Sequence, residues 1–317
     1  MLIPNLRDSA STTPAERQDR LMGTTVYQRV YGLDGERCCE LGHHEVLRLE
    51  QLWSFFLPRS EVNELARRAG VATVKVAPDT AAIVSQARSL HEFTEGAFDI
   101  TTGPVTALWR AAAARGCVPT AEELEAAHAL VNGQELELTA PCDVKLRRAG
   151  QRLDLGAIGK GYAADRCIDI YRAHGIRHAL IDLGGNVAVL GGKPDGSPWR
   201  VGLQFPGRVR GESFGWLEAR DTSVVTSGNY ERGYSFGPQR HGHVLDPRTG
   251  TPLTNSSLSV TVVDASSTLA DALSTALLVM GSERAFDFAV EQGIDAVIFD
   301  QGMIRVTPGL SSSFGMS

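Results

Sequence analysis

The sequence predicts an α+β fold in which mixed sheets pack against helices. Short β-branched segments occur in hairpin-like pairs, as in "HALIDLGGNVAVLGG" at 178–192, where a double glycine separates two strands. Long amphipathic segments, such as "DTAAIVSQARSLHEFTEG" at 79–96, have the apolar spacing of helices. Strands and helices do not alternate one by one, so a strictly parallel, doubly wound sheet is disfavoured.

In the first half of the chain, a strand comes before a series of helices. The segment "TTVYQRVYG" at 24–32 is β-branched and aromatic, which is typical of a strand, and 43–48 is a second strand candidate. The apolar spacing that follows predicts a helix that ends at Pro58 and begins again after Ser60. Further helices are predicted within 79–96, 97–116 and 121–131, and half-buried strands at 135–138 and 143–147.

In the second half, a helix that ends near Ala173 is followed mainly by strands. The predicted strands after the double-glycine pair are 199–206, 214–220, 222–228, 257–265, 295–300 and 302–308, with helices from near Thr268 and at 282–292. Residues 1–20 are predicted to be a flexible leader, 21–310 a single domain and 311–317 a C-terminal tail.

Composition excludes several classes of partner. The net charge is −6 and no run of lysine and arginine could follow a phosphate backbone, so we expect no nucleic-acid partner. No stretch reaches the ~18 uninterrupted apolar residues of a membrane span. The five cysteines are odd in number and form no C-x-x-C, and the first residues lack the apolar core of a secretory signal. We therefore expect a cytoplasmic protein.

The segment "LDLGAIGKGYAAD" at 153–165 is the first candidate site. It joins a strand-like start, an acid, three glycines and a lysine to a helix. Glycines allow close approach of a ligand and a helix start offers free N–H groups, which together favour a phosphate ester. A strand-to-helix turn that simply needs glycines is the alternative, and neither the dinucleotide-binding nor the Walker glycine pattern is present.

Three other segments carry chemistry-bearing side chains. Asp271 and Thr275 are four residues apart on a predicted apolar helix, where they could hold a magnesium ion, or Asp271 could merely complement the helix dipole. In "HGHVLDPRTGTP" at 241–252, the histidines beside an acid could act as a general base or belong to an ordinary turn. The turn "GAFDITTGP" at 96–104 could contact a flat heterocycle or be buried.

The order and wording of these segments resemble the ApbE family of flavin transferases. Seven matches, spread from about Met22 to Val306, carry the resemblance: "MGTT" at 22–25, "GAFDITTGP" at 96–104, "DLGAIGKGYAAD" at 154–165, "ALIDLGGNV" at 179–187, "TSGNYER" at 226–232, "HVLDPRTGTP" at 243–252 and "ADALSTAL" at 270–277. The resemblance implies an ApbE-like, T-fold-related domain over 21–310, with FAD in a cleft between its subregions.

The resemblance also implies a role for particular residues. Its metal, usually Mg²⁺ but with Mn²⁺ or Ca²⁺ as alternatives, would be bound by Asp271, Thr275 and the main-chain carbonyl of Ala157. His243 is the leading catalytic candidate. The implied contacts to FAD are Met22, Phe56, Ala97, Phe98, Asp99, Asp154, Lys160 and Val244.

The implied activity is Mg²⁺-dependent transfer of FMN from FAD to a threonine or serine hydroxyl of an acceptor protein, with release of AMP. Attack by water would instead make the protein a metal-dependent FAD pyrophosphatase, and loss of turnover would leave a non-catalytic FAD-binding protein. Three positions depart from the family pattern. Lys160 stands where some relatives have an acid, Asn229 replaces a common aspartate, and Phe56 is the nearest match to a tyrosine near the flavin.

Overall fold

The computed structural model describes residues 13–209, 211–230, 233–236 and 239–316. These residues form an eight-stranded sheet in the order β1-β2-β6-β7-β10-β15-β16-β17, in which every neighbouring pair is antiparallel. The strands are β1 (Ala15–Leu21), β2 (Thr24–Tyr31), β6 (His178–Leu183), β7 (Asn186–Leu190), β10 (Ser223–Gly228), β15 (Ser259–Asp264), β16 (Asp295–Asp300) and β17 (Met303–Val306). The predicted α+β class is confirmed.

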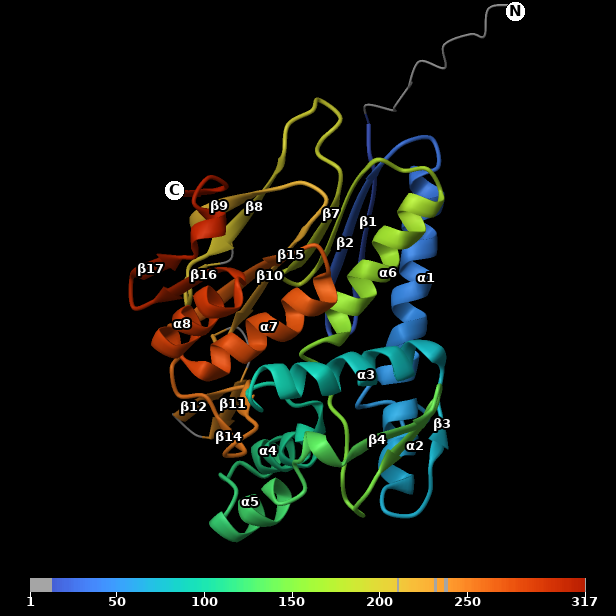
Figure 1. The fold of residues 1–317 in the computed structure, drawn as a ribbon, viewed down its shortest axis with the longest axis vertical. Helices are drawn as coiled ribbons and strands as arrows, with labels where there is room; N and C mark the ends of the chain where they lie inside the picture. Colours follow the sequence, from blue (N-terminus) through green and yellow to red (C-terminus); the bar gives the residue numbers. More distant parts are fainter. Residues whose placement is uncertain (1–12, 210, 231–232, 237–238, 317) are drawn as a thin grey trace, which may run out of the picture.

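Helices cover one face of this sheet (Figure 1). They are α1 (Gly35–Trp53), α6 (Gly159–Ala173), α7 (Ser267–Met280) and α8 (Ser282–Gln292). Because strand side chains alternate, Val260 and Val262 of β15 join the core under the helices, whereas Val297 and Phe299 of β16 pack on the opposite face. The central strands are therefore apolar on both faces, as the sequence pattern indicates.

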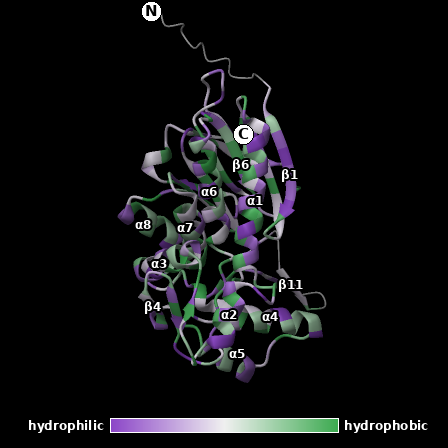
Figure 2. Ribbon diagram, turned by 90° about the vertical axis from the view of Figure 1, so that its right-hand side faces the viewer, coloured by the Kyte–Doolittle hydropathy of each residue, from purple (hydrophilic) through white to green (hydrophobic). Residues whose placement is uncertain are grey.

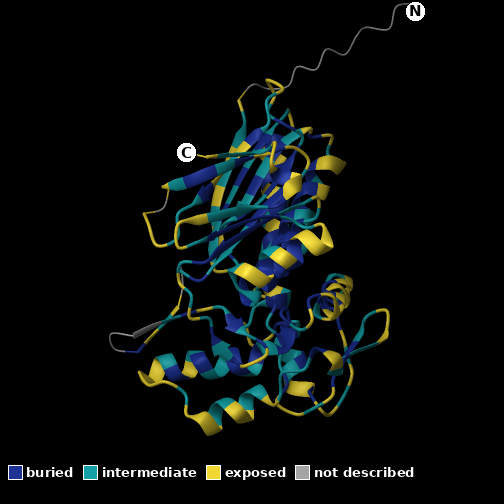
Figure 3. Cartoon of the chain, turned by 60° about the vertical axis from the view of Figure 1, so that its left-hand side comes forward, coloured by how far each residue is buried: buried dark blue, intermediate teal, exposed yellow. Residues whose placement is uncertain are grey.

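A second sheet closes the opposite face of the large one. It has the order β18-β9-β8, from β8 (Trp199–Gln204), β9 (Ser213–Ala219) and β18 (Phe314–Met316). Trp199 and Phe214 from this sheet pack against Val224 and Phe299 of the large one. The burial map in Figure 3 shows buried residues concentrated between these layers and exposed ones on the outer helix surfaces.

A smaller subregion lies below the large sheet in Figure 1. It contains α2 (Glu61–Arg68), α3 (Pro78–Phe93), α4 (Gly103–Arg115) and α5 (Ala121–His128), the sheet β3-β5-β4 (Val74–Lys75, Asp143–Leu146, Leu136–Ala140), and the short pairs β11-β12 (Gly233–Phe236, Gln239–Gly242) and β13-β14 (Leu245–Asp246, Thr251–Pro252). The predicted restart after Ser60 is confirmed, since its side chain accepts the first hydrogen bond of α2 from the Asn63 N–H.

Two predictions about the chain ends need correction. Residues 15–20 of the predicted leader belong to β1, and the predicted tail contains β18, which pairs with β9. β1 is an edge strand of mainly hydrophilic residues (Figure 2), stabilised by pairing with β2 and by ion pairs such as Arg17–Asp19. Its polar composition hides it from a search for β-branched residues. The first twelve residues lie outside the described part of the chain.

The strand candidate at 43–48 is also wrong, because this segment belongs to α1. Cys39, Gly42, Val46, Leu49 and Trp53 are buried at intervals of three or four residues, which is helical spacing. The helix begins at Gly35, well before the apolar pattern that predicted it.

Two hairpin tips bring separate motifs to one end of the large sheet. Met22 and Gly23 connect β1 to β2 with φ of 50° and 69°, and Gly184 and Gly185 connect β6 to β7 with φ of 66° and 98°. Such two-residue turns with positive φ match the twist of hairpin strands, and glycine adopts them without strain. Since Val26 of β2 pairs antiparallel with Leu183 of β6, both tips lie at the same sheet end.

Candidate active site

A cavity of about 950 Å³ opens at this end of the sheet. Both hairpin tips line it, together with the glycine loop before α6, the face of α7 that carries Asp271, and the segment around His243. The structure thus brings all seven family-like segments to one cavity, with "GAFDITTGP" contributing Thr102 and "TSGNYER" contributing residues 226–228 and Tyr230. Residues 231–232 of that segment lie outside the described residues.

Inside the cavity, the start of α6 meets α7. The Gly161 N–H donates a 2.9 Å hydrogen bond to Oδ2 of Asp271, whose side chain is 2 % exposed. Nζ of Lys160 lies 3.2 and 3.4 Å from the two Asp271 carboxylate oxygens and 3.0 Å from the Gly156 carbonyl oxygen. Because α7 begins at Ser267, Asp271 lies beyond its first turn and complements the dipole of α6 instead.

A second carboxylate joins the two helices in the reverse direction. Asp165 of α6 accepts hydrogen bonds from the Ser267 and Thr268 N–H groups at 2.7 and 2.9 Å, and from the Ser266 and Thr268 hydroxyls at 3.0 and 2.6 Å. These are the first residues of α7, whose N–H groups have no partner within the helix. Asp165 therefore caps α7 while Asp271 caps α6.

Oxygen atoms that could bind a metal line the same cavity as the Asp271 carboxylate. Thr275, one turn further along α7, has its hydroxyl 3.1 Å from the Ser227 hydroxyl and 3.2 Å from the Asp271 carbonyl oxygen. Ala157 of the glycine loop and Asp154 also line the cavity, and one oxygen of Asp154 accepts a 2.9 Å bond from the Gly156 N–H. Two acids, the hydroxyls of Thr275 and Ser227 and the glycine loop thus line the same cavity.

The histidine segment reaches the cavity through His243 and Val244. His243 is exposed and lines the cavity. The side chain of Asn229 holds the backbone next to it, because Asn229 Oδ1 accepts a 3.3 Å hydrogen bond from the Val244 N–H and Nδ2 donates a 2.7 Å bond to the Leu253 carbonyl oxygen. His241 does not line the cavity and packs beside Trp109, with ring centroids 5.7 Å apart. The two histidines of the motif therefore have different surroundings.

Aromatic and basic side chains also line the cavity. Phe56 is 71 % exposed, and the Arg110 guanidinium lies 4.3 Å from its ring centroid. Burial raises the pKa of Tyr234, although Arg110 acts in the opposite direction, so this phenol keeps its proton at neutral pH. Met22 also lines the cavity, with its N–H bonded to the Glu50 carboxylate at 2.8 Å.

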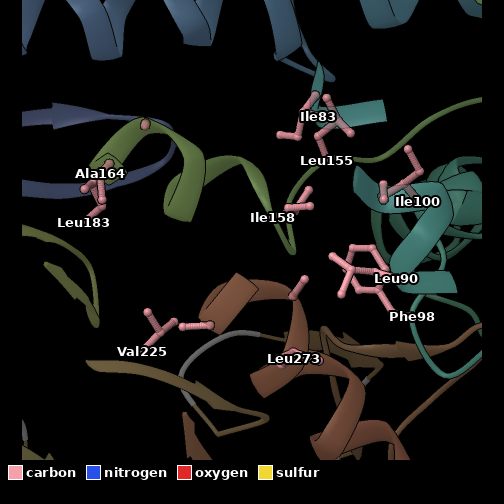
Figure 4. Packing of buried hydrophobic residues seen from close by; sticks show 14 of the residues in the cluster. Ile83, Leu90, Phe98, Ile100, Leu155, Ile158, Ala164, Leu183, Val225 and Leu273 are labelled. Atoms are coloured by element: carbon pink, nitrogen blue, oxygen red, sulfur yellow. The ribbon is translucent and has the colours of Figure 1, made fainter. Parts of the chain in front are cut away.

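Ala97, Phe98 and Asp99 are not among the residues that line this cavity, although Thr102 of the same segment is. Phe98 is 2 % exposed and packs in the core with Leu155 and Ile158 of the glycine loop (Figure 4). The Asp99 carboxylate is used internally, because it accepts from the Thr101 N–H at 2.7 Å and the Gly133 N–H at 2.9 Å. The turn at 96–99 therefore packs against the glycine loop through core contacts.

Sequence reasoning missed several residues that line the cavity. Thr102, Thr106 and Arg110 do so from one helical face, and their spacing of four residues is a signal that could have found them. Asn186 follows the double glycine, is 2 % exposed and lines the cavity, yet its Nδ2 has no hydrogen-bond partner among the described residues. A buried amide donor without a partner is costly and points to a ligand acceptor.

Together the fold and the cavity define an α+β protein in which a helix start and a buried acid face one large cavity. The family model of the ApbE family matches residues 22–298. This match covers most of the chain, which therefore belongs to the ApbE family. Among residues 13–316, leaving out those not described, no helix is long and apolar enough to cross a membrane.

Two named proteins and one solved structure are similar to this chain over most of their own length. A Klebsiella pneumoniae protein named FAD:protein FMN transferase is 36 % identical over 265 residues, covering 83 % of this chain and 82 % of that protein. A Treponema pallidum protein of the same name is 33 % identical, covering 93 % and 87 %. The crystal structure of the ApbE protein from Thermotoga maritima has a TM-score of 0.86 at 28 % identity, covering 95 % of this chain and 99 % of that one.

Proposed function

We propose that this protein transfers FMN from FAD to a threonine or serine hydroxyl of an acceptor protein in a Mg²⁺-dependent reaction that releases AMP. The observation that carries the proposal is the meeting of Asp271, Thr275 and the start of α6 in one cavity. The names of its relatives, FAD:protein FMN transferase, support the same reaction. Mn²⁺ or Ca²⁺ could replace Mg²⁺ at a site made of oxygen ligands.

The charge of the cavity supports a metal requirement. Its lining contains four acids, Glu50, Asp154, Asp182 and Asp271, against two permanent cations, Arg110 and Lys160. An anionic pyrophosphate entering this excess of negative charge needs additional positive charge to be held there. A divalent cation that accompanies the phosphates would supply it.

The residues present fit such an ion. Asp271 is a buried carboxylate, and Thr275 and the Ala157 carbonyl add neutral oxygens, which are the ligands that Mg²⁺ prefers. Mg²⁺ commonly uses one or two protein carboxylates and completes its shell with water and substrate phosphates. In the described part of the chain, no group of three or more His, Cys, Asp or Glu side chains is arranged to hold a metal. In this proposal, oxygens of the substrate phosphates would complete the ligand set of the ion.

The remaining lining residues would bind and orient FAD. The Gly161 N–H at the start of α6 is bonded to Asp271, so we expect the positive end of the helix dipole, together with Lys160, to attract the pyrophosphate. Met22, Phe56 and Val244 offer apolar surface to the flavin ring. Lys160 would contact a phosphate oxygen, and Asn186 would donate a hydrogen bond to a flavin or ribityl oxygen.

In the chemical step, the acceptor hydroxyl oxygen attacks the phosphorus of the FMN half. The bond from that phosphorus to the bridging oxygen breaks, and AMP leaves with the bridging oxygen. His243, or a nearby carboxylate such as Asp154, accepts the hydroxyl proton. When bound, the metal neutralises charge on both phosphates.

Asp271→Ala tests the metal assignment. We expect Mg²⁺-dependent release of AMP and attachment of flavin to proteins in an extract of the expressing cells to fall by about 100-fold or more. Asp169→Ala removes an acid from an exposed position of α6 and serves as the matched control. Wild-type rates in Asp271→Ala would disprove the assignment.

His243→Ala should slow turnover while FAD still binds, and loss of FAD binding would make His243 a substrate contact.

Hydrolysis of FAD by water is a second candidate, favoured by the exposed Phe56 at the cavity mouth, which leaves access for solvent. Incubation with FAD and Mg²⁺ without acceptor separates the two. Rapid formation of FMN and AMP would indicate a pyrophosphatase, whereas retained FAD supports transfer.

A cytoplasmic acceptor is part of the proposal, because all five cysteines are free, which suits a reducing compartment.

A further inference from the structure

We propose that Lys160 makes metal binding at Asp271 conditional on FAD, because its ammonium group and the metal compete for one carboxylate. This inference rests on the proposed function, since it takes the metal to bind at Asp271. It adds a role for a residue that family resemblance assigns only to contact with FAD.

The first observation is that the Asp271 carboxylate already has a positive partner. Nζ of Lys160 lies 3.2 Å from one carboxylate oxygen and 3.4 Å from the other. The side chains of Lys160 and Asp271 are only 23 % and 2 % exposed, so water screens their interaction weakly. The ammonium therefore supplies the charge that makes a buried carboxylate tolerable.

The second observation is that the oxygens of the Asp271 carboxylate already accept other hydrogen bonds. Its Oδ2 also accepts the 2.9 Å hydrogen bond from the Gly161 N–H. A divalent cation bound to either oxygen would stand a few ångströms from the ammonium, and like charges at such distances repel strongly in a partly buried site. Metal and ammonium cannot both keep their contacts with Asp271.

The third observation shows where the ammonium can go. Lys160 is the second residue of α6 and lines the cavity beside that helix start. A cation there is disfavoured by the helix dipole, whereas an anion is favoured. The pyrophosphate of FAD would offer oxygens to Lys160, whose flexible four-carbon side chain can turn toward them.

FAD and the metal should consequently bind with positive coupling. A metal alone must displace an ion pair and leave the ammonium without an acceptor other than the Gly156 carbonyl. With FAD present, the ammonium moves to a phosphate and Asp271 becomes available. Because linkage is reciprocal, the metal strengthens FAD binding by the same factor.

Lys160→Met tests the coupling, because methionine keeps much of the side-chain length and removes the charge. Lys160→Arg is the control that keeps the charge, and Lys160→Gln is a second neutral variant. Binding of MgCl₂ is measured by calorimetry with and without saturating FAD, AMP is assayed in the same samples to verify intact FAD, and melting is followed with and without MgCl₂.

For the wild type, we expect FAD to tighten Mg²⁺ binding about tenfold or more. Both neutral variants should bind Mg²⁺ alone about tenfold more tightly than the wild type, lose most of the coupling, and show a larger rise of Tm on adding MgCl₂ alone. Lys160→Arg should keep the coupling.

Neutral variants that bind Mg²⁺ alone no more tightly than the wild type would overturn the inference, as would loss of coupling in Lys160→Arg. The proposed metal site fails separately if Asp271→Asn binds Mg²⁺ and FAD with unchanged affinity and coupling. That variant therefore distinguishes a wrong metal site from a wrong role for Lys160.

Discussion

Substitution of Gly161 by alanine should separate α6 from α7, because this glycine allows the two helices to approach. A Cβ atom added at Gly161 would lie 2.2 Å from the Ser267 carbonyl oxygen and 2.8 Å from the Asp271 Cβ. Relaxed contacts of this kind lie at about 3.3 Å or more, so the helices must move apart by ~1 Å. The obstacle is backbone at the start of α7, which cannot turn aside as a side chain can.

The magnitude follows from three contributions. Overpacking of this kind costs about 1–3 kcal/mol. A shift of ~1 Å also breaks the hydrogen bond from the Gly161 N–H to Asp271, which contributes about 1 kcal/mol. Alanine gains about 1 kcal/mol of helix propensity over glycine. We expect the free energy of unfolding of Gly161→Ala to fall by about 2 kcal/mol, with weaker FAD binding because Asp271 moves.

The assay is urea unfolding of the wild type, Gly161→Ala and Gly159→Ala, followed by circular dichroism. Gly159 is a matched control two residues earlier in α6, where an added Cβ would meet nothing closer than Trp53 at 3.6 Å, an ordinary contact. Gly159→Ala should therefore be as stable as the wild type or slightly more stable. If Gly161→Ala proves as stable as Gly159→Ala, close approach to α7 is not the reason for this glycine.

Three further substitutions have measurable consequences. Asn186→Ala should weaken FAD binding about 2- to 10-fold without lowering stability, because it removes a buried donor that lacks a protein partner; a loss of stability would instead make Asn186 structural. Asp165→Asn should cost about 1–2 kcal/mol in urea unfolding, since it weakens the cap of α7, and a cost near zero would contradict the cap. Burial tends to raise the pKa of Asp79, but hydrogen bonds from Arg48 and Tyr162 outweigh it and lower this pKa. The stability that this carboxylate contributes is therefore present above its unfolded pKa of about 3.9 and is lost as pH falls through the lower folded value. The stability difference between the wild type and Asp79→Asn should be full at neutral pH and shrink in strong acid, and a constant difference would refute the pKa shift.

The elements that sequence predicts well are those with a strong local pattern. The restart of a helix after Ser60, the helix within 97–116 and the double-glycine hairpin each follow from residues close together in the chain. The polar composition of β1 hides a strand that forms a hairpin with β2, and β18 depends on a partner far away in the chain, β9.

For the site, motif order identified the right segments but not which of their side chains face the cavity. In the "GAFD" turn, Asp99 accepts hydrogen bonds from N–H groups of its own region and Phe98 lies in the core. Spacing along the chain cannot reveal this, because the partner of Asp99 at Gly133 is 34 residues away. The unpaired amide of Asn186 is likewise visible only after the surrounding strands are in place.

The position of Asp271 argues against one of the two interpretations that the sequence left open, the one in which it complements its own helix. An acid that merely complements its own helix belongs in the first turn, yet Ser266 caps α7 and Asp165 binds its first N–H groups. Asp271 lies further along, buried, and directed at the start of another helix that lines the cavity. Burial of a charge there is a cost to folding, and the dipole of α6 and Lys160 offset it. A carboxylate maintained at such a cost at the wall of an acidic cavity supports the metal site proposed above, and unchanged Mg²⁺ binding in Asp271→Asn would contradict it.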